Sequence, residues 1–194
     1  MLTLNFYSEN AKEYACFETS NNNSNWGKNI LLAELCEGSK ILEIGTGGGY
    51  DAQFFLQRGY DVLMTEASAK LALETSKKLG KEIRVCTVSD IREVNHFHAV
   101  WANSVFSHIP RSNINQVIKT LLQSLRAGGW LVFSVHAGEE DSRDACGRLY
   151  VGYTISSLER ILHKYQPSSL KFWKCRDLAF TGDEVEQIWV ACKF

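Results

Sequence analysis

Residues 40–66 read KILEIGTGGGYDAQFFLQRGYDVLMTE, and this stretch decides the fold class. A short apolar run ends at Gly45, and the helical pattern over 50–58 that follows is stopped by Gly59. The next apolar run, 60–65, predicts a second strand. A strand, a glycine turn, a helix and another strand form a βαβ unit, in which the two strands are parallel.

The same alternation continues along the chain. Ser68 is a suitable N-cap for a helix that ends at Gly80. Further strands are predicted at 83–88, 98–102 and 130–135, helices at 114–125 and 156–165, and two strands at the C-terminus. The helix over 114–125 carries a single apolar stripe, formed by Ile114, Val117, Ile118, Leu121, Leu122 and Leu125. The polar stretches 19–25 and 137–147 are predicted to be loops. The pattern predicts an α/β fold with a mainly parallel sheet covered by helices on both faces.

Composition restricts the classes of function. The 194 residues are 45% hydrophobic and 22% charged, which is typical of one globular domain. The formal net charge of -1 disfavours a nucleic-acid binder that depends on bulk positive charge. No apolar run is long enough to span a membrane, and the N-terminus lacks a secretion signal. The six scattered cysteines predict reduced thiols, no metal site and a cytoplasmic location.

The glycine turn at 45–49 is the first candidate for ligand binding, because open α/β sheets bind ligands at the carboxyl ends of their strands. A dinucleotide fingerprint requires a third glycine where Tyr50 stands, and the lysine of a P-loop is missing. Glu43 lies just before the turn, and its negative carboxylate is better suited to binding a cation than a pyrophosphate. This position favours the ammonium group of an amino acid.

Two more acids follow the next strands. Glu66 ends the second strand, where a carboxylate can accept both ribose hydroxyls. Asp90 follows the third strand, where it can accept the exocyclic amine of an adenine. An amine, a ribose and an adenine are thus recognised in order along the sheet, and S-adenosylmethionine contains these three groups.

The chain resembles the class I S-adenosylmethionine-dependent methyltransferases over nearly its whole length. It is similar above all to a small stand-alone subgroup like the tellurite-resistance methyltransferases. The matching stretches are FYSENAKEYA (6–15), ILEIGTGGGYDAQFFLQRGYDV (41–62), VWANSVFSHIPRS (100–112), LRAGGWLVFSV (125–135) and CGRLYVGYT (146–154). The family usually has Asp at positions 43 and 66 and Cys at position 46, where this chain has Glu43, Glu66 and Thr46.

The resemblance implies a Rossmann-like, doubly wound sheet of seven strands with an antiparallel last strand. It also implies an N-terminal helical lid over residues 1–37 and a core over 38–194. The residues implied to bind the cofactor are Glu43, Gly45, Thr46, Gly47, Gly49, Asp51, Glu66, Ala67, Asp90, Ile91, Asn103 and Ser104.

Catalytic and acceptor-binding candidates come from three other segments. His108 follows the fourth strand and is a candidate base. Tyr7 and Tyr14 lie seven residues apart, on one face of the predicted lid, where aromatic rings can attract a sulfonium. His136, Arg148 and Tyr153 are candidates for lining the acceptor pocket, and Arg148 suits an anionic acceptor.

The sequence therefore predicts a methyltransferase that acts on a small-molecule acceptor by in-line displacement and releases S-adenosylhomocysteine. A catalytically silent protein that binds the cofactor is one alternative, and a nicotinamide-dependent oxidoreductase is another, disfavoured by Tyr50. No Asn-Pro-Pro-Tyr or Asp-Pro-Pro-Tyr segment follows the fourth strand, so no nucleic-acid partner is expected. No membrane partner is expected either, because no apolar run is long enough to span a membrane. The acceptor atom (oxygen, nitrogen, sulfur or a metalloid) and the oligomeric state are left open.

Overall fold

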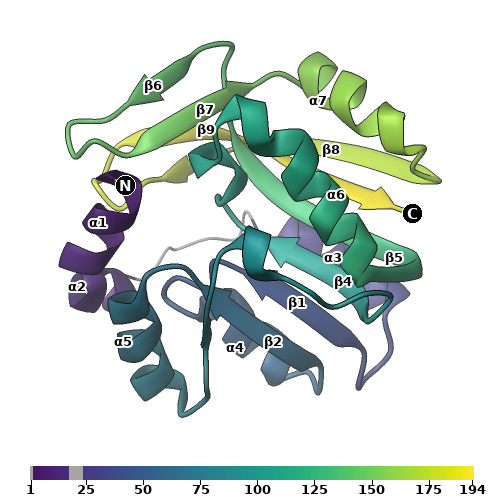
Figure 1. The fold of residues 1–194 in the computed structure, drawn as a ribbon, viewed down its shortest axis with the longest axis horizontal. Coiled ribbons are helices and arrows are strands. Elements are labelled where there is room, and N and C mark those ends of the chain that lie inside the picture. Colours follow the sequence, from purple (N-terminus) through teal and green to yellow (C-terminus); the bar gives the residue numbers. More distant parts are fainter. Residues whose placement is uncertain (1, 18–23) are drawn as a thin grey trace.

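The structure is a computed structural model that describes residues 2–17 and 24–194 (Figure 1). Five strands run parallel in the order β3-β2-β1-β4-β5, β9 pairs antiparallel with β5, and β8 pairs antiparallel with β9. The predicted fold class is confirmed, with nine strands among the described residues where seven were expected. The strands are β1 (Lys40–Ile44), β2 (Asp61–Glu66), β3 (Arg84–Val85), β4 (Phe97–Ala102), β5 (Leu125–Ala137), β6 (Asp141–Arg143), β7 (Leu149–Tyr153), β8 (Ser169–Leu178) and β9 (Glu184–Lys193).

Helices cover both faces of the sheet: α3, α4 and α5 lie on one side, and α6 and α7 on the other. The helices are α1 (Leu2–Glu9), α2 (Ala11–Cys16), α3 (Asn25–Glu34), α4 (Tyr50–Leu56), α5 (Ala69–Leu79), α6 (Ile114–Ser124) and α7 (Ile155–Leu162). Ser68 caps α5 as predicted, since its Oγ accepts a hydrogen bond from the Leu71 amide at 3.3 Å.

Two loop predictions have different outcomes. Positions 19–23 of the predicted loop 19–25 lie outside the described residues, and Asn25 already belongs to α3. The prediction of a loop over 137–147 is wrong in its middle, because β6 forms there and pairs antiparallel with β7. All three β6 residues are exposed, so no apolar alternation marks the strand in the sequence.

The core has a layer on each face of the sheet. On the α6 and α7 side, the predicted stripe of α6 buries Ile114, Ile118 and Leu121 against the strands. On the other side, Leu31 of α3 packs with the buried ring of Trp101 in β4. Burial of apolar side chains on both faces explains why the central strands read as nearly continuous apolar runs.

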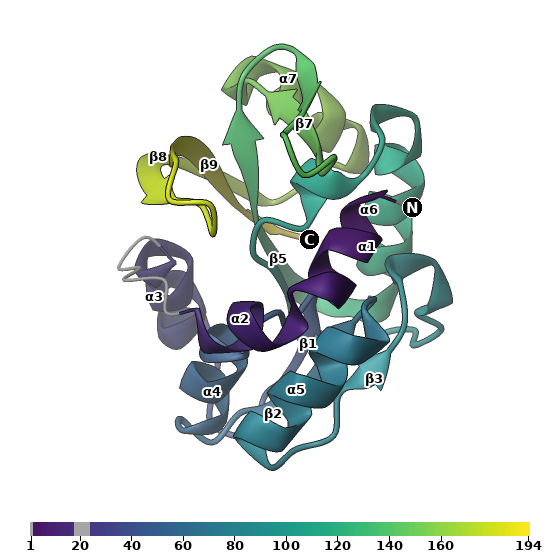
Figure 2. The same cartoon turned by 90° about the vertical axis from the view of Figure 1, so that its left-hand side faces the viewer.

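The segment predicted as a lid divides into two parts with different surroundings. Helices α1 and α2 pack on α5 and cross the carboxyl-end side of the sheet (Figure 2). Helix α3 instead packs on β5 and β9, where Gly27 faces the side chains of Val132 and Trp101. A lid that moves as one body is therefore expected to consist of α1 and α2 alone.

Gly49 lets the chain pass from the glycine turn directly into α4, with φ at +80°. A Cβ there would lie 2.8 Å from side-chain carbons of Leu79 and Thr75 on α5. We expect Gly49→Ala to lower the free energy of unfolding by about 2–4 kcal/mol, because it adds backbone strain to overpacking. Gly80→Ala is the matched control, since φ is +63° but nothing lies within 4 Å of the added Cβ. Urea unfolding measures both variants, and equal losses would contradict the packing argument.

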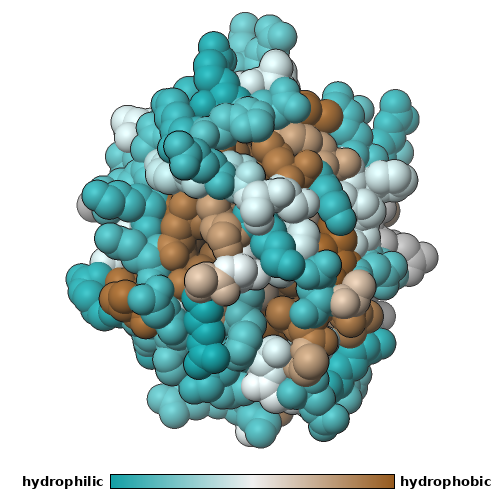
Figure 3. Space-filling model, turned by 90° about the vertical axis from the view of Figure 1, so that its right-hand side faces the viewer, coloured by the Kyte–Doolittle hydropathy of each residue, from teal (hydrophilic) through white to brown (hydrophobic). Residues whose placement is uncertain are grey.

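The side of the molecule seen in Figure 3 is largely hydrophilic. Apolar side chains reach the surface there in separate patches between hydrophilic ones (Figure 3). None of the helices in residues 2–17 and 24–194 combines the length and apolar character that a membrane span needs.

Candidate active site

A cavity of about 180 Å³ lies at the carboxyl ends of β1, β4 and β5. The glycine turn lines it from one side, and α1, α2 and the loop between β8 and β9 also contribute to its wall. Eight of the predicted cofactor residues line the cavity: Glu43, Gly45, Thr46, Gly47, Gly49, Asp51, Asn103 and Ser104. Tyr7, Tyr14, His108, His136 and Arg148 line it as well.

Glu43 is almost fully buried, with 2% of its surface exposed. The Thr46 hydroxyl donates a hydrogen bond of 2.8 Å to its Oε2. Burial, and secondly the nearby charge of Asp51, raise the pKa of Glu43 to about 8. The carboxyl group is therefore mostly protonated at neutral pH until a cation is placed beside it.

This pKa gives the protein a measurable pH dependence. A carboxyl whose pKa rises from 4.5 in the unfolded chain to about 8 on folding stabilises the fold fully below pH 4.5, and this stabilisation is lost as the pH rises to 8. We expect Glu43→Gln to gain about 2 kcal/mol of stability relative to the wild type between pH 6 and pH 8. Urea unfolding at several pH values measures this gain. A difference between the two proteins that does not change with pH would contradict the assignment.

Asp51 is the centre of a polar network on the cavity wall. Its carboxylate forms an ion pair of 2.5 Å with Lys28 of α3, whose side chain is 8% exposed. It also accepts hydrogen bonds from Trp101 Nε1 at 2.9 Å and Asn103 Nδ2 at 3.0 Å. Lys28, which the sequence analysis missed, brings a buried ammonium group to the cavity.

The residues predicted to hold the ribose and adenine do not line this cavity. The Glu66 carboxylate accepts the amides of Gly47 at 3.1 Å and Ser68 at 2.9 Å, so it ties the glycine turn to the end of β2. Burial raises the pKa of Glu66, although these amides oppose the shift. Asp90 is exposed and accepts from the amide and hydroxyl of Thr87. The remaining two residues of this group are Ala67, which adjoins Glu66, and Ile91, which packs in the core.

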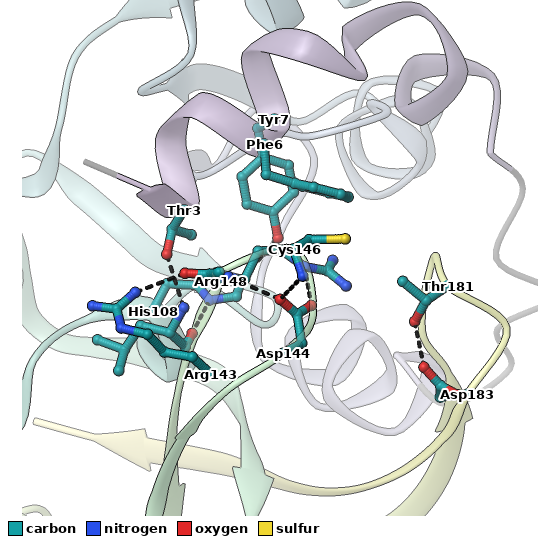
Figure 4. Close-up of polar contacts among 12 residues, drawn as sticks. Thr3, Phe6, Tyr7, His108, Arg143, Asp144, Cys146, Arg148, Thr181 and Asp183 are labelled. Atoms are coloured by element: carbon teal, nitrogen blue, oxygen red, sulfur yellow. Dashed lines mark hydrogen bonds and ion pairs between the residues drawn. The ribbon is translucent and has the colours of Figure 1, made fainter.

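Tyr7 of α1 and His108, which follows β4, form a hydrogen-bonded pair (Figure 4). His108 Nδ1 lies 2.6 Å from the carbonyl oxygen of Leu149, so this nitrogen carries the proton and donates. Burial lowers the pKa of His108, which keeps the ring neutral, so its Nε2 accepts from the Tyr7 hydroxyl at 2.8 Å. Burial also raises the pKa of Tyr7 well above its ordinary value, which keeps the phenol protonated.

The rings of Tyr7 and Tyr14 are in contact, but not because they lie on one face of a single helix, as predicted. The helix is interrupted at Asn10, and the two rings lie on separate helices, α1 and α2. Their centroids are 5.0 Å apart in an edge-to-face arrangement. Phe180, from the loop between β8 and β9, packs 5.1 Å from Tyr14. Phe180 also lies 5.8 Å from the Phe6 ring of α1, so this loop closes the cavity together with α1 and α2, which the sequence analysis did not foresee.

Arg148 joins the hairpin of β6 and β7 to α1. Its Nε donates to Asp144 Oδ2 at 2.7 Å, and its guanidinium lies 4.2 Å from the centroid of the Phe6 ring (Figure 4). The Thr3 hydroxyl accepts the Leu149 amide at 2.9 Å in the same contact (Figure 4). Since Asp144 already balances the charge of Arg148, attraction of an anionic acceptor is weaker than the sequence suggested.

His136 and Tyr150 form the wall opposite the glycine turn. The two rings stack with their centroids 4.3 Å apart. Burial, and secondly His108, lower the pKa of His136 to about 4, so this ring is neutral at physiological pH.

The structure does not bring Tyr153 to the cavity. Side chains alternate along β7, and Tyr153 faces the core on the same side as Val151, whereas Tyr150 lines the cavity.

Within residues 2–17 and 24–194, no cluster of three or more His, Cys, Asp or Glu side chains is arranged to hold a metal ion. The groups that the cavity does bring together are a glycine turn, a buried ammonium and a neutral Tyr–His pair. This arrangement can hold a zwitterionic ligand on one side and accept a proton from a second molecule on the other.

Comparison with known proteins identifies the family. Residues 9–182 match the family model described as a methyltransferase domain. The chain belongs to this family. The resemblance to class I S-adenosylmethionine-dependent methyltransferases is thus confirmed by both family and fold.

Two curated relatives match about half of the chain. The ubiquinone biosynthesis O-methyltransferase of Bordetella avium is 29% identical over 53% of this chain and 45% of its own length. The protein-L-isoaspartate O-methyltransferase 2 of Syntrophobacter fumaroxidans is 31% identical over 54% of this chain and 42% of its own length. The chain thus spans less than half the length of these relatives.

A solved structure shares the fold over a longer stretch. The Burkholderia thailandensis 1,6-didemethyltoxoflavin-N1-methyltransferase, with bound 1,6-didemethyltoxoflavin and S-adenosylhomocysteine, has a TM-score of 0.77 and 18% sequence identity. The match covers 99% of this chain and 87% of the other.

Proposed function

We propose that this protein binds S-adenosylmethionine and transfers its methyl group to a small-molecule acceptor, releasing S-adenosylhomocysteine. The observation that carries the proposal is that one cavity has the glycine turn on one side and the Tyr7–His108 pair on the other. Because helices and a loop enclose it, the cavity admits a small molecule more readily than a folded polymer. The similar Burkholderia enzyme, bound to 1,6-didemethyltoxoflavin, supports this class of acceptor.

The residues present fit the cofactor. Lys28, which is ion-paired with Asp51, is proposed to donate a hydrogen bond to the carboxylate of the methionine part, and Glu43 to meet its ammonium group. The Glu66 carboxylate lies at the end of β2, the place where ribose hydroxyls are accepted in such folds. When bound, S-adenosylmethionine supplies a methyl group activated on a sulfonium.

The protein's own residues supply a route for a proton. Tyr7 donates to His108 Nε2, so the phenol oxygen can accept a proton from the acceptor as its own proton passes to the imidazole. The Leu149 carbonyl holds the imidazole in the required tautomer. We therefore assign Tyr7 and His108 as the acid–base pair, while Tyr14 packs against Tyr7 and excludes water.

Calorimetry with S-adenosylhomocysteine tests the proposal. We expect the wild type to bind, and Lys28→Met to bind about tenfold more weakly because a charge-assisted hydrogen bond is lost. The control ligand is methylthioadenosine, which lacks the amino-acid part and should bind both proteins equally. No heat at millimolar S-adenosylhomocysteine would contradict the cofactor, and equal losses for both ligands would contradict the role of Lys28.

We further propose that the protein works in the cytoplasm. All six cysteines lie in the described part of the chain, and they are free thiols. A reducing compartment suits such a set.

A further inference from the structure

Gln187 of β9 carries a hydrogen-bond acceptor that has no partner. The residue lines the cavity and is 5% exposed. Its Nε2 donates to Ser104 Oγ at 3.1 Å, but its buried Oε1 receives no hydrogen bond. Three other buried side chains of the described chain also have an unpartnered polar atom, and none of them lines the cavity: Trp130, Tyr153 and Trp189.

A chain of hydrogen bonds fixes which end of the Gln187 amide is unpaired. The Asp51 carboxylate can only accept, so the Asn103 amide group points its Nδ2 toward it. Asn103 Oδ1 then accepts the hydroxyls of Ser134 at 2.9 Å and Ser104 at 3.2 Å. Because the Ser104 proton is used in this way, its oxygen accepts from Gln187 Nε2, which leaves Gln187 Oε1 without a donor.

Gln187 lies on the acceptor side of the cavity. It is directly opposite His136 in the antiparallel pair of β5 and β9, so the two side chains are on the same face of the sheet. Three strand spacings separate β9 from β1, which is about 14 Å. The backbone of Gln187 is therefore closer to His136 than to the glycine turn after β1, where the amino-acid part of the cofactor is proposed to lie.

A buried acceptor without a donor is costly, and a ligand that supplies the donor removes the cost. Building on the proposed function, we infer that Gln187 determines acceptor specificity: its Oε1 accepts a hydrogen bond from an N–H or O–H group of a planar methyl acceptor. Planarity follows from the rings of Tyr7, Tyr150 and Phe180 on the cavity wall.

Matched pairs of planar probes test this inference by calorimetry, with the protein saturated with S-adenosylhomocysteine. The pairs are 2-quinolone and 1-methyl-2-quinolone, uracil and 1,3-dimethyluracil, and indazole and 1-methylindazole. In at least one pair, the wild type should bind the donor-bearing probe about tenfold more tightly than its methylated partner. Gln187→Met should reduce this preference to about twofold, because the accepting oxygen is gone.

Two variants control the interpretation. Gln187→Glu keeps an accepting oxygen and should keep the preference, and Gln53→Met makes the same exchange at an exposed site on α4 and should change nothing. The inference is wrong if no donor-bearing probe binds better than its partner, or if Gln187→Met keeps the preference. The inference is also wrong if the main effect of Gln187→Met is to weaken the binding of S-adenosylhomocysteine. Failure of the wild type to bind S-adenosylhomocysteine would instead refute the proposed function.

Discussion

Tyr7→Phe and His108→Gln are each expected to lower the rate of methyl transfer by about 10²- to 10⁴-fold while binding of S-adenosylhomocysteine stays within about twofold. The reason is the hydrogen-bond chain from Tyr7 through His108 to the Leu149 carbonyl. Removing either side chain leaves the acceptor's proton without a route. Release of S-adenosylhomocysteine with a panel of phenols and N–H heteroarenes measures the effect.

The two side chains act as one unit, so the double variant should be about as slow as either single variant. The pH profile is a second readout, because turnover should fall as acid protonates His108 Nε2. Since burial lowers the pKa of His108, this fall is expected below its ordinary range. Tyr165→Phe removes a remote hydroxyl, bonded to the Asn115 carbonyl, and should leave turnover unchanged.

An acceptor without a transferable proton separates this role from mere packing. Quinoline nitrogen attacks the methyl group through a lone pair, so its methylation needs no base. Tyr7→Phe should slow the methylation of the phenols strongly and the methylation of quinoline only slightly. If it slows both equally, the pair positions the acceptor and does not carry the proton.

Local patterns account for what the sequence predicted well. The glycine turn, the Ser68 cap and the apolar stripe of α6 are each set by neighbouring residues. The turn also carries most of the predicted cofactor side of the cavity, because its residues follow a buried strand directly. The order of elements along the chain was therefore sufficient for the fold class.

Features that depend on distant pairing could not be predicted. Strand β6 is exposed and forms only because β7 is its partner. The structure places Tyr150 and not Tyr153 on the cavity wall, and the sequence does not show which face of β7 meets the cavity. In the sequence, the only sign that Lys28 and Gln187 are functional is that each is a polar residue within a largely apolar segment. That both segments line one cavity is visible only from tertiary contacts.

Glu66→Ala is expected to weaken S-adenosylhomocysteine binding by about 10²- to 10³-fold. A carboxylate that accepts two ribose hydroxyls makes two charge-assisted hydrogen bonds, and both are lost with the side chain. Glu66 also holds the amides of Gly47 and Ser68, so the loss includes some disorder of the turn. Asp90→Asn should lower the affinity for S-adenosylhomocysteine only about tenfold, since Asp90 is exposed and its proposed role is one hydrogen bond to the adenine.

Ligand truncation separates the two roles of Glu66. Adenosine contains the ribose and adenine does not. Glu66→Ala should therefore weaken the binding of adenosine strongly and the binding of adenine only slightly. Glu66→Asp, which restores the acid usual in the family, should recover most of the affinity because a shorter carboxylate still accepts both hydroxyls. Equal losses for adenosine and adenine, with no recovery in Glu66→Asp, would mean that Glu66 acts by holding the glycine turn and does not bind the ribose.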